Sequence, residues 1–280
     1  MALLLWLPAS QASAQLLAAK DGPIVYGHHH LNVTSVDEHK KFWVATLGGT
    51  AITIGTNKRE IIRFPNALLF MNAMPPGGPT KGTTMNHIGF SVPDLRALVA
   101  KVKANGFRMV TAEEAPAGIK VENDIGLATG GDVSGIAYAL GPDGVKVELV
   151  ELKKQTVPIM SHHIHFFGPQ QKEMHDWYMK VFGAKDRPGL TGSFMGADLP
   201  GVGLNFSVAT EPVAGTRGRA IDHIGFEVKN LEAFTKTLAA QGIKLDGAYR
   251  RVDALNISIA FITDPWGTYI ELTEGLDTVN

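Results

Sequence analysis

The chain has 280 residues, of which 45% are hydrophobic and 19% are charged. This balance excludes a disordered chain, which lacks apolar residues, and a membrane protein with several spans, which needs long apolar runs. The net charge of −1 gives no general attraction to nucleic acid or to a membrane surface, so we expect neither of those partners. The oligomeric state stays open, a homo-oligomer included.

Cysteine is missing from the sequence, and this limits the chemistry further. Disulfides, cysteine-ligated zinc, iron–sulfur clusters and thiol nucleophiles are all removed. Any bound metal must therefore be held by histidine and carboxylate side chains. The chain contains ten histidines that could serve as such ligands.

Residues 1–20 resemble a secretory signal peptide. The apolar stretch Ala2–Leu7 precedes Ala12–Ala14, which has the small-x-small spacing that signal peptidase cuts. The stretch is short and no Lys or Arg precedes it, so an unstructured N-terminal tail is the alternative. A genuine signal places the mature protein in the periplasm or outside the cell, and otherwise the protein is cytoplasmic.

The pattern of elements after this segment predicts the order βαβββ, followed by the same order again. A strand at Ile24–Thr34 precedes a helix at Val36–Leu47, and the loop Met74–Gly82 separates this unit from a strand at Met85–Val92. Asp94 is placed to cap a helix that ends at Gly106. Further short strands are expected near Thr50–Gly55, Ile61–Phe64, Ala67–Asn72, Ile136–Leu140 and Val145–Leu152.

Three motifs of the first half recur in the same order in the second half. They are His28–Leu31 and His163–Phe166, Asn86–Val92 and Asp222–Val228, and Gly141–Glu148 and Asp264–Glu271. The repeat predicts two modules, 22–153 and 158–276, joined by the linker Lys153–Pro158. The last pair is more closely spaced than the others, so module 1 contains extra residues within Ala112–Gly135.

Strand alternation places one set of polar residues of each module on the face opposite the apolar core positions. The set is His28, His87 and Glu148 in module 1 and His163, His223 and Glu271 in module 2. Two neutral imidazoles and one carboxylate form a facial triad for a divalent metal and leave positions open for substrate. A single histidine of this kind is more often a hydrogen-bonded structural residue, but the repetition of all three types favours metal binding.

These motifs resemble the vicinal oxygen chelate superfamily, which includes glyoxalases, extradiol dioxygenases, fosfomycin-resistance transferases and bleomycin-binding proteins. The resemblance rests on His28–Val33, Phe42–Gly48, Asn86–Val92, Gly141–Glu148 and their counterparts in module 2. It implies an α+β fold of two tandem modules, each a pair of βαβββ units that form a curled mixed sheet around a metal pocket.

The family's metal ligands fall on the same six residues that alternation selects. The resemblance implies a divalent metal, with Fe(II) or Mn(II) favoured over Zn(II) or Ni(II). His30 and His165 lie two residues beyond a ligand on the same face, and we expect an acid–base role for them. Tyr138 occupies the place of an active-site tyrosine in extradiol dioxygenases. The alternative is a hydrogen-bonded pocket wall for the two histidines and a core position for the tyrosine.

The sequence is compatible with three functions. The first is a dioxygenase-type enzyme acting on a small aromatic or vicinal-oxygen substrate, the second a lyase or isomerase with a metal-stabilised enediolate, and the third a small-molecule binding protein. The strands at 67–72 and 203–207 lack the carboxylate of a glyoxalase I site, and no histidine stands shortly before Tyr138 as an extradiol site requires. His29 and His162 are expected to face away from the pockets, and His39 and His175 to lie on exposed helix surfaces.

Overall fold

The computed structural model describes residues 23–188 and 194–278. Residues 1–20, the predicted signal peptide, lie outside the described residues. Among the helices of the described ranges, none has the length and apolar character needed to cross a membrane. The described chain forms four consecutive units, each with a first strand, a helix and further strands.

Units 1 and 2 make up the first module. Unit 1 contains β1 (Ile24–Val33), α1 (Val36–Lys40), the π-helix η2 (Lys41–Thr46), β2 (Thr50–Ile54), β3 (Arg59–Phe64) and β4 (Ala67–Ala73). Unit 2 contains β5 (Met85–Val92), α2 (Leu95–Ala104), β6 (Arg108–Met109), α3 (Thr111–Glu114), β7 (Val121–Glu122), β8 (Ile125–Gly130), β9 (Val133–Leu140), the 3-10 turn η3 (Pro142–Gly144) and β10 (Lys146–Glu151).

Units 3 and 4 make up the second module. Unit 3 contains β11 (Met160–Gly168), α4 (Gln171–Phe182), β12 (Lys185–Asp186), β13 (Phe194–Leu199) and β14 (Val202–Val208). Unit 4 contains β15 (Ile221–Val228), α5 (Leu231–Ala240), β16 (Arg250–Val252), β17 (Ile257–Thr263), β18 (Tyr269–Glu274) and the 3-10 turn η4 (Leu276–Thr278).

Local chemistry explains where these elements begin and end. The Asp94 side chain accepts a hydrogen bond from the Ala97 amide and caps α2, which ends before Gly106 at φ 83°. The helix expected at Val36–Leu47 is present, but its second half is wound as the π-helix η2. The extra residues of module 1 include α3 and β7, which lack counterparts among the described elements of module 2, whereas β8 pairs with β9 as β16 pairs with β17.

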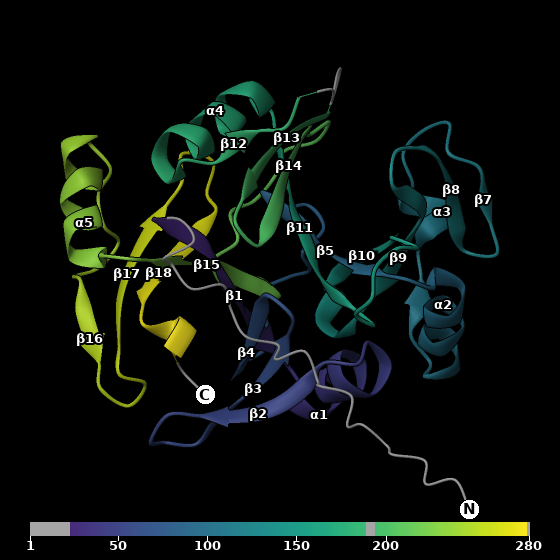
Figure 1. Cartoon of the computed structure of the whole chain (residues 1–280), viewed down its shortest axis with the longest axis horizontal. Coiled ribbons are helices and arrows are strands. Elements are labelled where there is room, and N and C mark those ends of the chain that lie inside the picture. The colour runs from purple at the N-terminus through teal and green to yellow at the C-terminus, as the bar shows by residue number, and fades with distance from the viewer. Residues whose placement is uncertain (1–22, 189–193, 279–280) are drawn as a thin grey trace, which may run out of the picture.

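The strands assemble into two sheets, and each sheet combines one unit from each module. The eight-stranded sheet has the order β16-β17-β18-β15-β1-β4-β3-β2, and we call it sheet I. The ten-stranded sheet has the order β12-β13-β14-β11-β5-β10-β9-β8-β7 with β6 beside β9, and we call it sheet II. Figure 1 shows the result, with the green strand β15 beside the purple N-terminal strand β1 and the yellow strands β18 and β17 beyond it.

The tandem α+β fold is therefore confirmed, but the units pair differently from the expectation that both units of one module share a sheet. Antiparallel pairs join β1 to β15 at the centre of sheet I and β5 to β11 at the centre of sheet II. Alternation fixes the face that a side chain occupies, but it does not fix which unit lies at the free edge of a strand. The segments 74–84 and 209–220 lead from one sheet to the other, so each module is divided between the sheets.

Apolar faces of both sheets pack against helices in one continuous core. Leu31, Phe90, Phe166 and Phe226 are each at most 1% exposed and belong to it. Trp43 of η2 is fully buried among these residues. The opposite strand faces are polar at their centres, as the alternation predicted, and these faces hold the candidate site residues.

Candidate metal centres

The six predicted metal ligands gather in two buried clusters, together with His30 and His165. We call them the Glu148 cluster (His87, Glu148, His163 and His165) and the Glu271 cluster (His28, His30, His223 and Glu271). In each, one ligand atom per residue lies within 4.8 Å of the others. Compared with the grouping by module, His28 and His163 have changed places. The reason is the sheet assembly, because β1 lies beside β15 and β11 lies beside β5.

In the Glu148 cluster, two imidazoles converge on one carboxylate oxygen. Nε2 of His87 and Nε2 of His163 lie 2.9 and 3.1 Å from Oε2 of Glu148. His165 stands directly opposite His87 across the β5–β11 pair, with its Nδ1 3.2 Å from Nε2 of His87. The other ring nitrogen of His165 lies 2.9 Å from the Ser207 hydroxyl.

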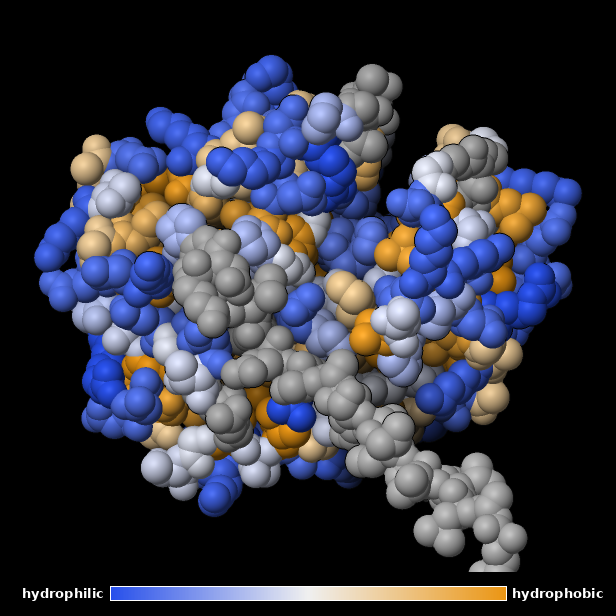
Figure 2. Space-filling model, in the orientation of Figure 1, coloured by the Kyte–Doolittle hydropathy of each residue, from blue (hydrophilic) through white to orange (hydrophobic). Residues whose placement is uncertain are grey.

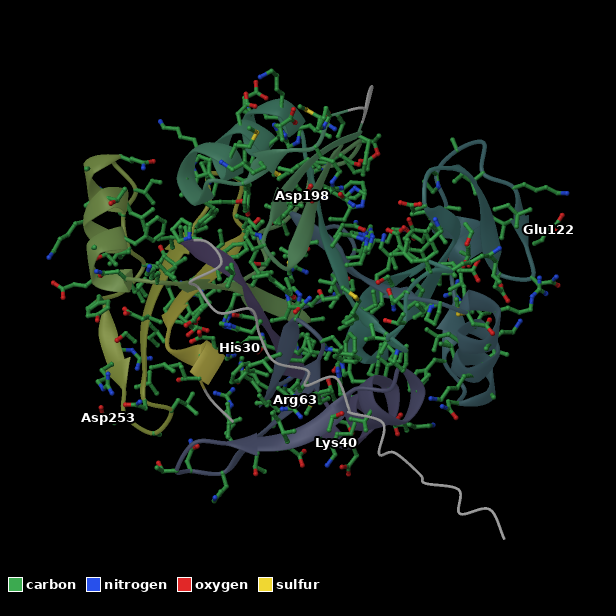
Figure 3. All side chains as sticks on the ribbon, in the orientation of Figure 1. His30, Lys40, Arg63, Glu122, Asp198 and Asp253 are labelled. Carbon is green, nitrogen blue, oxygen red and sulfur yellow. The ribbon has the colours of Figure 1, made fainter. Side chains whose placement is uncertain are left out.

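The Glu271 cluster repeats this geometry in sheet I. Nε2 of His28 and Nε2 of His223 lie 2.8 and 3.1 Å from Oε2 of Glu271, and Nε2 of His30 lies 3.5 Å away. His30 stands opposite His223 in the strand pairing, and its ring stacks on His223 and on Phe70. Figure 3 places His30 beside the N-terminal strand, close to the C-terminal strands of sheet I.

A glycine in each central strand makes room for one imidazole. A Cβ atom on Gly89 would lie 2.2 Å from the ring of His163, and one on Gly225 would lie 2.0 Å from the ring of His28. Contacts this short between non-bonded atoms are not tolerated. The repeated His-Ile-Gly-Phe motif therefore requires glycine at this position, because a histidine ring from the other module packs directly against it.

Hydrogen bonds orient the histidines so that Nε2 faces the carboxylate. Nδ1 of His223 lies 2.6 Å from a carboxylate oxygen of Asp222, which can only accept, so Nδ1 must carry a proton. Nδ1 of His87 lies 2.9 Å from Oδ1 of Asn86 in the same way. A neutral imidazole protonated at Nδ1 presents a lone pair at Nε2, which is the form that binds a metal.

The donor set fits a divalent metal. In a neutral His87 held by Asn86, a lone pair at Nε2 would face the lone pairs of the Glu148 carboxylate, and a cation between them relieves the repulsion. Two ligand atoms at right angles, each about 2.1 Å from a metal, are about 3.0 Å apart. The observed separations of 2.9 and 3.1 Å match this value.

The protonation states also suit metal ligation. Burial acts to raise the pKa of Glu148, but the His163 and His87 imidazoles outweigh it and hold that pKa well below its usual range. Burial lowers the pKa of His87 to about 4. The pKa of Glu271 is likewise held well below its usual range, because hydrogen bonds from His223 and His28 outweigh the effect of burial. Near neutral pH these groups favour an ionised carboxylate, and His87 favours the neutral imidazole.

The surroundings of the two clusters differ greatly. The Glu148 cluster lies in a cavity of about 780 Å³, and Figure 2 shows a deep hollow between the α3–β8 segment and the β13–β14 segment that border it. The Glu271 cluster lies in a cavity of about 190 Å³ with mostly aliphatic and aromatic walls, such as Phe70, Ile259 and Phe261. Of these two cavities, the first alone falls within the range of about 300–1,000 Å³ that is usual for small-molecule sites.

Tyr138 belongs to the large cavity. It lies opposite Glu148 in the β9–β10 pair and lines the cavity wall at 4% exposure. Burial and the negative charge of Glu148 raise the pKa of its hydroxyl, so the phenol keeps its proton. The corresponding residue opposite Glu271 is Phe261, which has no hydroxyl to offer.

Sequence reasoning missed a cation beside the Glu148 cluster. Lys146 is 4% exposed, lines the large cavity, and donates a hydrogen bond of 2.8 Å to Glu114. Glu114 also pairs with Lys81 at 2.5 Å. Alternation already put Lys146 on the face of Glu148, but its carboxylate partner lies in α3, inside the extra segment for which the sequence offered no fold.

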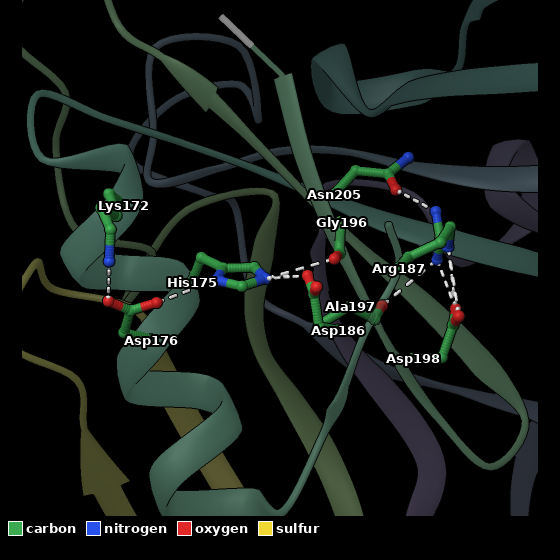
Figure 4. Close-up of polar contacts among 9 residues, drawn as sticks. All are labelled: Lys172, His175, Asp176, Asp186, Arg187, Gly196, Ala197, Asp198 and Asn205. Atoms are coloured by element: carbon green, nitrogen blue, oxygen red, sulfur yellow. Dashed lines mark hydrogen bonds and ion pairs between the residues drawn. The ribbon is translucent and has the colours of Figure 1, made fainter. Parts of the chain in front are cut away.

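The predicted exposure of two histidines is wrong. His39 is fully buried, with Nε2 3.0 Å from Asp143 and Nδ1 accepting from Trp43. His175 is 3% exposed, and its ring nitrogens lie near Gly196 and Asp176, as Figure 4 shows. Both helices turn these side chains toward the sheets, where carbonyl or carboxylate oxygens satisfy them.

His29 and His162 are not members of the two clusters. His29 is buried against the Tyr26 hydroxyl. Nδ1 of His162 lies 2.8 Å from Nδ1 of His163, so His162 contacts the back of a ligand ring.

Comparison with known proteins places the chain in a family. A model of the Glyoxalase/Bleomycin resistance protein/Dioxygenase superfamily matches residues 25–149 and 161–272. Glyoxalase I from Zea mays is 18% identical with a TM-score of 0.65, over 91% of this chain and 94% of the other. A proposed dioxygenase from Bacillus subtilis subsp. subtilis str. 168 is 12% identical with a TM-score of 0.63, over 89% of this chain and 84% of the other. No curated protein matches the sequence.

Proposed function

The chain belongs to the Glyoxalase/Bleomycin resistance protein/Dioxygenase superfamily, and from this premise we propose that it is a divalent-metal-dependent enzyme whose reaction takes place at the Glu148 cluster. One observation carries the proposal. The Glu148 carboxylate receives His87 and His163, and His87 and Glu148 line a cavity of about 780 Å³ that is also lined by two further groups able to move protons, His165 and Tyr138. The Glu271 cluster has equivalent ligands but no such cavity.

His87, Glu148 and His163 would hold the metal, with Fe(II) or Mn(II) favoured by a set of two imidazoles and one carboxylate. A bound divalent metal would accept two neighbouring oxygen atoms of a substrate and stabilise negative charge on them. The cavity volume suits a small aromatic or other oxygen-rich molecule. We favour dioxygenase-type chemistry, with O₂ as the second substrate.

His165 provides the acid–base group that the sequence around Tyr138 lacks. Burial lowers the pKa of His165 well below its usual range, so the ring is held in its neutral form, with one nitrogen that can donate and one that can accept a hydrogen bond. Its Nε2 contacts Ser207 and its Nδ1 approaches His87, so the ring lies between the cavity wall and the ligands. Tyr138, which lies on β9 opposite Glu148 of β10, is a hydroxyl donor toward the same centre.

A lyase or isomerase is the second candidate. The observation in its favour is the pair Tyr138 and His165, because two acid–base groups at one metal centre can move a proton between neighbouring carbons without O₂. Against a glyoxalase I site, β4 and β14 contain no carboxylate, and His165 stands as the fourth member of the cluster.

The test begins with metal content. We would reconstitute the protein with Fe(II), Mn(II), Zn(II) or Ni(II) and measure bound metal in the wild type, Glu148→Gln and Glu271→Gln. Oxygen uptake would then be screened with small diols and hydroxy acids. We expect turnover to fall by at least about 10³-fold in Glu148→Gln and to persist in Glu271→Gln.

Three outcomes separate the candidates. Turnover that consumes O₂ supports the dioxygenase. Turnover that continues in the absence of O₂ supports the lyase or isomerase instead. Wild-type protein that stays metal-free after all four reconstitutions, yet still binds small molecules, would overturn the metal-dependent enzyme and leave a binding protein.

A further inference from the structure

The polar lining of the large cavity is rich in hydrogen-bond donors. Arg187 donates to Oδ1 of Asn205 at 2.9 Å, and because arginine can only donate, the amide oxygen of Asn205 must face it. Figure 4 shows the amide nitrogen of Asn205 directed away from Arg187. Asn86 likewise directs its oxygen to His87, so both amides leave their NH₂ groups for the cavity that they line.

Lys146 adds a buried positive charge to these donors. Its side chain is 5% exposed, and its ammonium group forms an ion pair with Glu114. The ammonium group lies 5.7 Å from the centre of the Tyr138 ring. Lys146 and Glu148 are two residues apart in β10, so their side chains lie on the same face of the strand. Burying an ammonium group is costly unless it is paired, so its place in a cavity wall calls for an anionic partner.

Glu114 neutralises one charge but is shared with a second cation. Lys81 also binds Glu114, and its side chain is 63% exposed at the cavity mouth. Two ammonium groups therefore share one carboxylate on this side of the cavity. The rest of the wall includes the rings of Phe167 and Phe194, which both pack against His165.

The Glu271 cluster offers a control within the molecule. Tyr269 occupies the position of Lys146, two residues before the glutamate, and α3 with its Glu114 has no counterpart among the described elements of module 2. The Lys146–Glu114 pair therefore accompanies the large cavity, whereas the cations that line the small cavity are Arg59 and Arg250.

We propose that Lys146 is the anion-binding residue of the large cavity, and that the substrate is an aromatic carboxylic acid. Its carboxylate binds the Lys146 ammonium group, its ring lies against Phe167 and Phe194, and its oxygen substituents reach the Glu148 cluster and the amides of Asn86 and Asn205. This inference rests on the proposed function, because it names the substrate class of the same site.

Three probes separate the two ends of the substrate. 3,4-Dihydroxybenzoate has both the carboxylate and the vicinal oxygens, catechol has the oxygens alone, and benzoate has the carboxylate alone. Dissociation constants would be measured by calorimetry on the Zn(II)-loaded and the metal-free protein, since zinc is redox-silent. The variants are Lys146→Met, which removes the charge, and Lys146→Arg, which keeps it. Lys103→Met is the matched control, because Lys103 pairs with Asp124 away from the cavity.

We expect the wild type to bind 3,4-dihydroxybenzoate at least about tenfold more tightly than catechol, since a charge-assisted hydrogen bond is added. Lys146→Met should abolish this preference without changing the affinity for catechol, whereas Lys146→Arg and Lys103→Met should retain it. A merely structural role of Lys146 would weaken both ligands equally. Benzoate should bind the metal-free wild type and lose affinity in Lys146→Met.

Equal affinity of the wild type for the diol with and without the carboxylate overturns the inference, and so does an unchanged preference in Lys146→Met. The two proposals can fail separately. If catechol binding does not depend on metal but benzoate binding depends on Lys146, the proposed metal chemistry fails and the anion site stands. If catechol binds through the metal and benzoate is indifferent to Lys146, the anion site fails alone.

Discussion

The Glu148 and Glu271 clusters have nearly the same ligands in nearly the same geometry, yet their surroundings differ at almost every other position. Tyr138 lies opposite Glu148, whereas Phe261 lies opposite Glu271. Lys146 precedes Glu148 by two residues, and Tyr269 takes the equivalent position before Glu271. The cavities measure about 780 and 190 Å³. The comparison teaches that the same set of histidine and glutamate side chains, which could hold a metal, can stand in walls of very different size and chemistry.

The largest effect is expected from the two glycines that face ligand rings. In Gly89→Ala the new methyl group would displace His163, and in Gly225→Ala it would displace His28. We expect Gly89→Ala to lose activity completely and Gly225→Ala to retain it, while both lose about 1–3 kcal/mol of stability. Metal content, turnover and thermal unfolding would be compared with Gly247→Ala, where a Cβ meets no atom within 4 Å. Equal turnover in the two variants would contradict the division of roles.

The second test exchanges the aromatic residues opposite the glutamates. Tyr138→Phe removes a proton donor from the large cavity, and we expect turnover to fall by about 10²-fold with metal content unchanged. Phe261→Tyr adds a hydroxyl at the Glu271 cluster and should leave turnover as it is. Steady-state kinetics on both variants provide the measurement, and an unaffected rate in Tyr138→Phe would assign the tyrosine to packing alone.

The third test uses one residue of the repeated motif that differs between the sheets. Glu227 of β15 in sheet I corresponds to Ser91 of β5 in sheet II. Burial raises the pKa of Glu227 from 4.5 to about 7, so the folded protein keeps this proton at pH values where the unfolded chain has lost it. The carboxyl therefore stabilises the fold below about pH 4.5, and this contribution is lost as the pH rises through 7.

We expect the wild type to lose roughly 2 kcal/mol of stability from this group between pH 5 and 8. Glu227→Gln cannot ionise and should flatten that part of the profile. Denaturant unfolding at several pH values measures it, with Ser91→Ala as the control that keeps the wild-type slope. A Gln variant with an unchanged slope would show that Glu227 is not the group responsible.

The smallest effect concerns the partners of Nδ1, which are an amide for His87 and a carboxylate for His223. A carboxylate makes the imidazole a stronger donor to a metal. Asn86→Asp should tighten metal binding at the Glu148 cluster by about tenfold, and Asp222→Asn should weaken it at the Glu271 cluster by a similar factor. Competition with a chelator measures both, and each variant is the control for the other cluster. Opposite signs would refute the assigned orientation of the rings.

Much of this fold can be predicted from the sequence, because the same motifs occur in the same order in both halves of the chain. The strand Met85–Val92 and the cap at Asp94 lie where the pattern places them. Alternation also selected the face on which His28, His87 and Glu148 lie. It could not select their neighbours, because period-two patterning is the same whichever strand is placed alongside.

Other features depended on contacts between distant segments. The burial of His39 arises from Asp143, which belongs to a turn 104 residues farther along the chain. The pairing of Lys146 with Glu114 depends on α3, whose sequence has no strong helical period of its own. Such features become visible when the partner segment is in place, since the sequence near each residue does not contain the reason for its position.

The crossed assembly of the sheets has a consequence for how the two ends of the chain are held. The contact between His28 and Glu271 joins residues 243 positions apart, whereas His163 and Glu148 are separated by 15. An ion bound at the Glu271 cluster would link residues near both ends of the described chain. It would therefore limit the freedom of the unfolded chain more than an ion at the Glu148 cluster, whose ligands His87 and His163 lie closer together in the sequence. The centre with the least room for a substrate is therefore the one best placed to fasten the molecule.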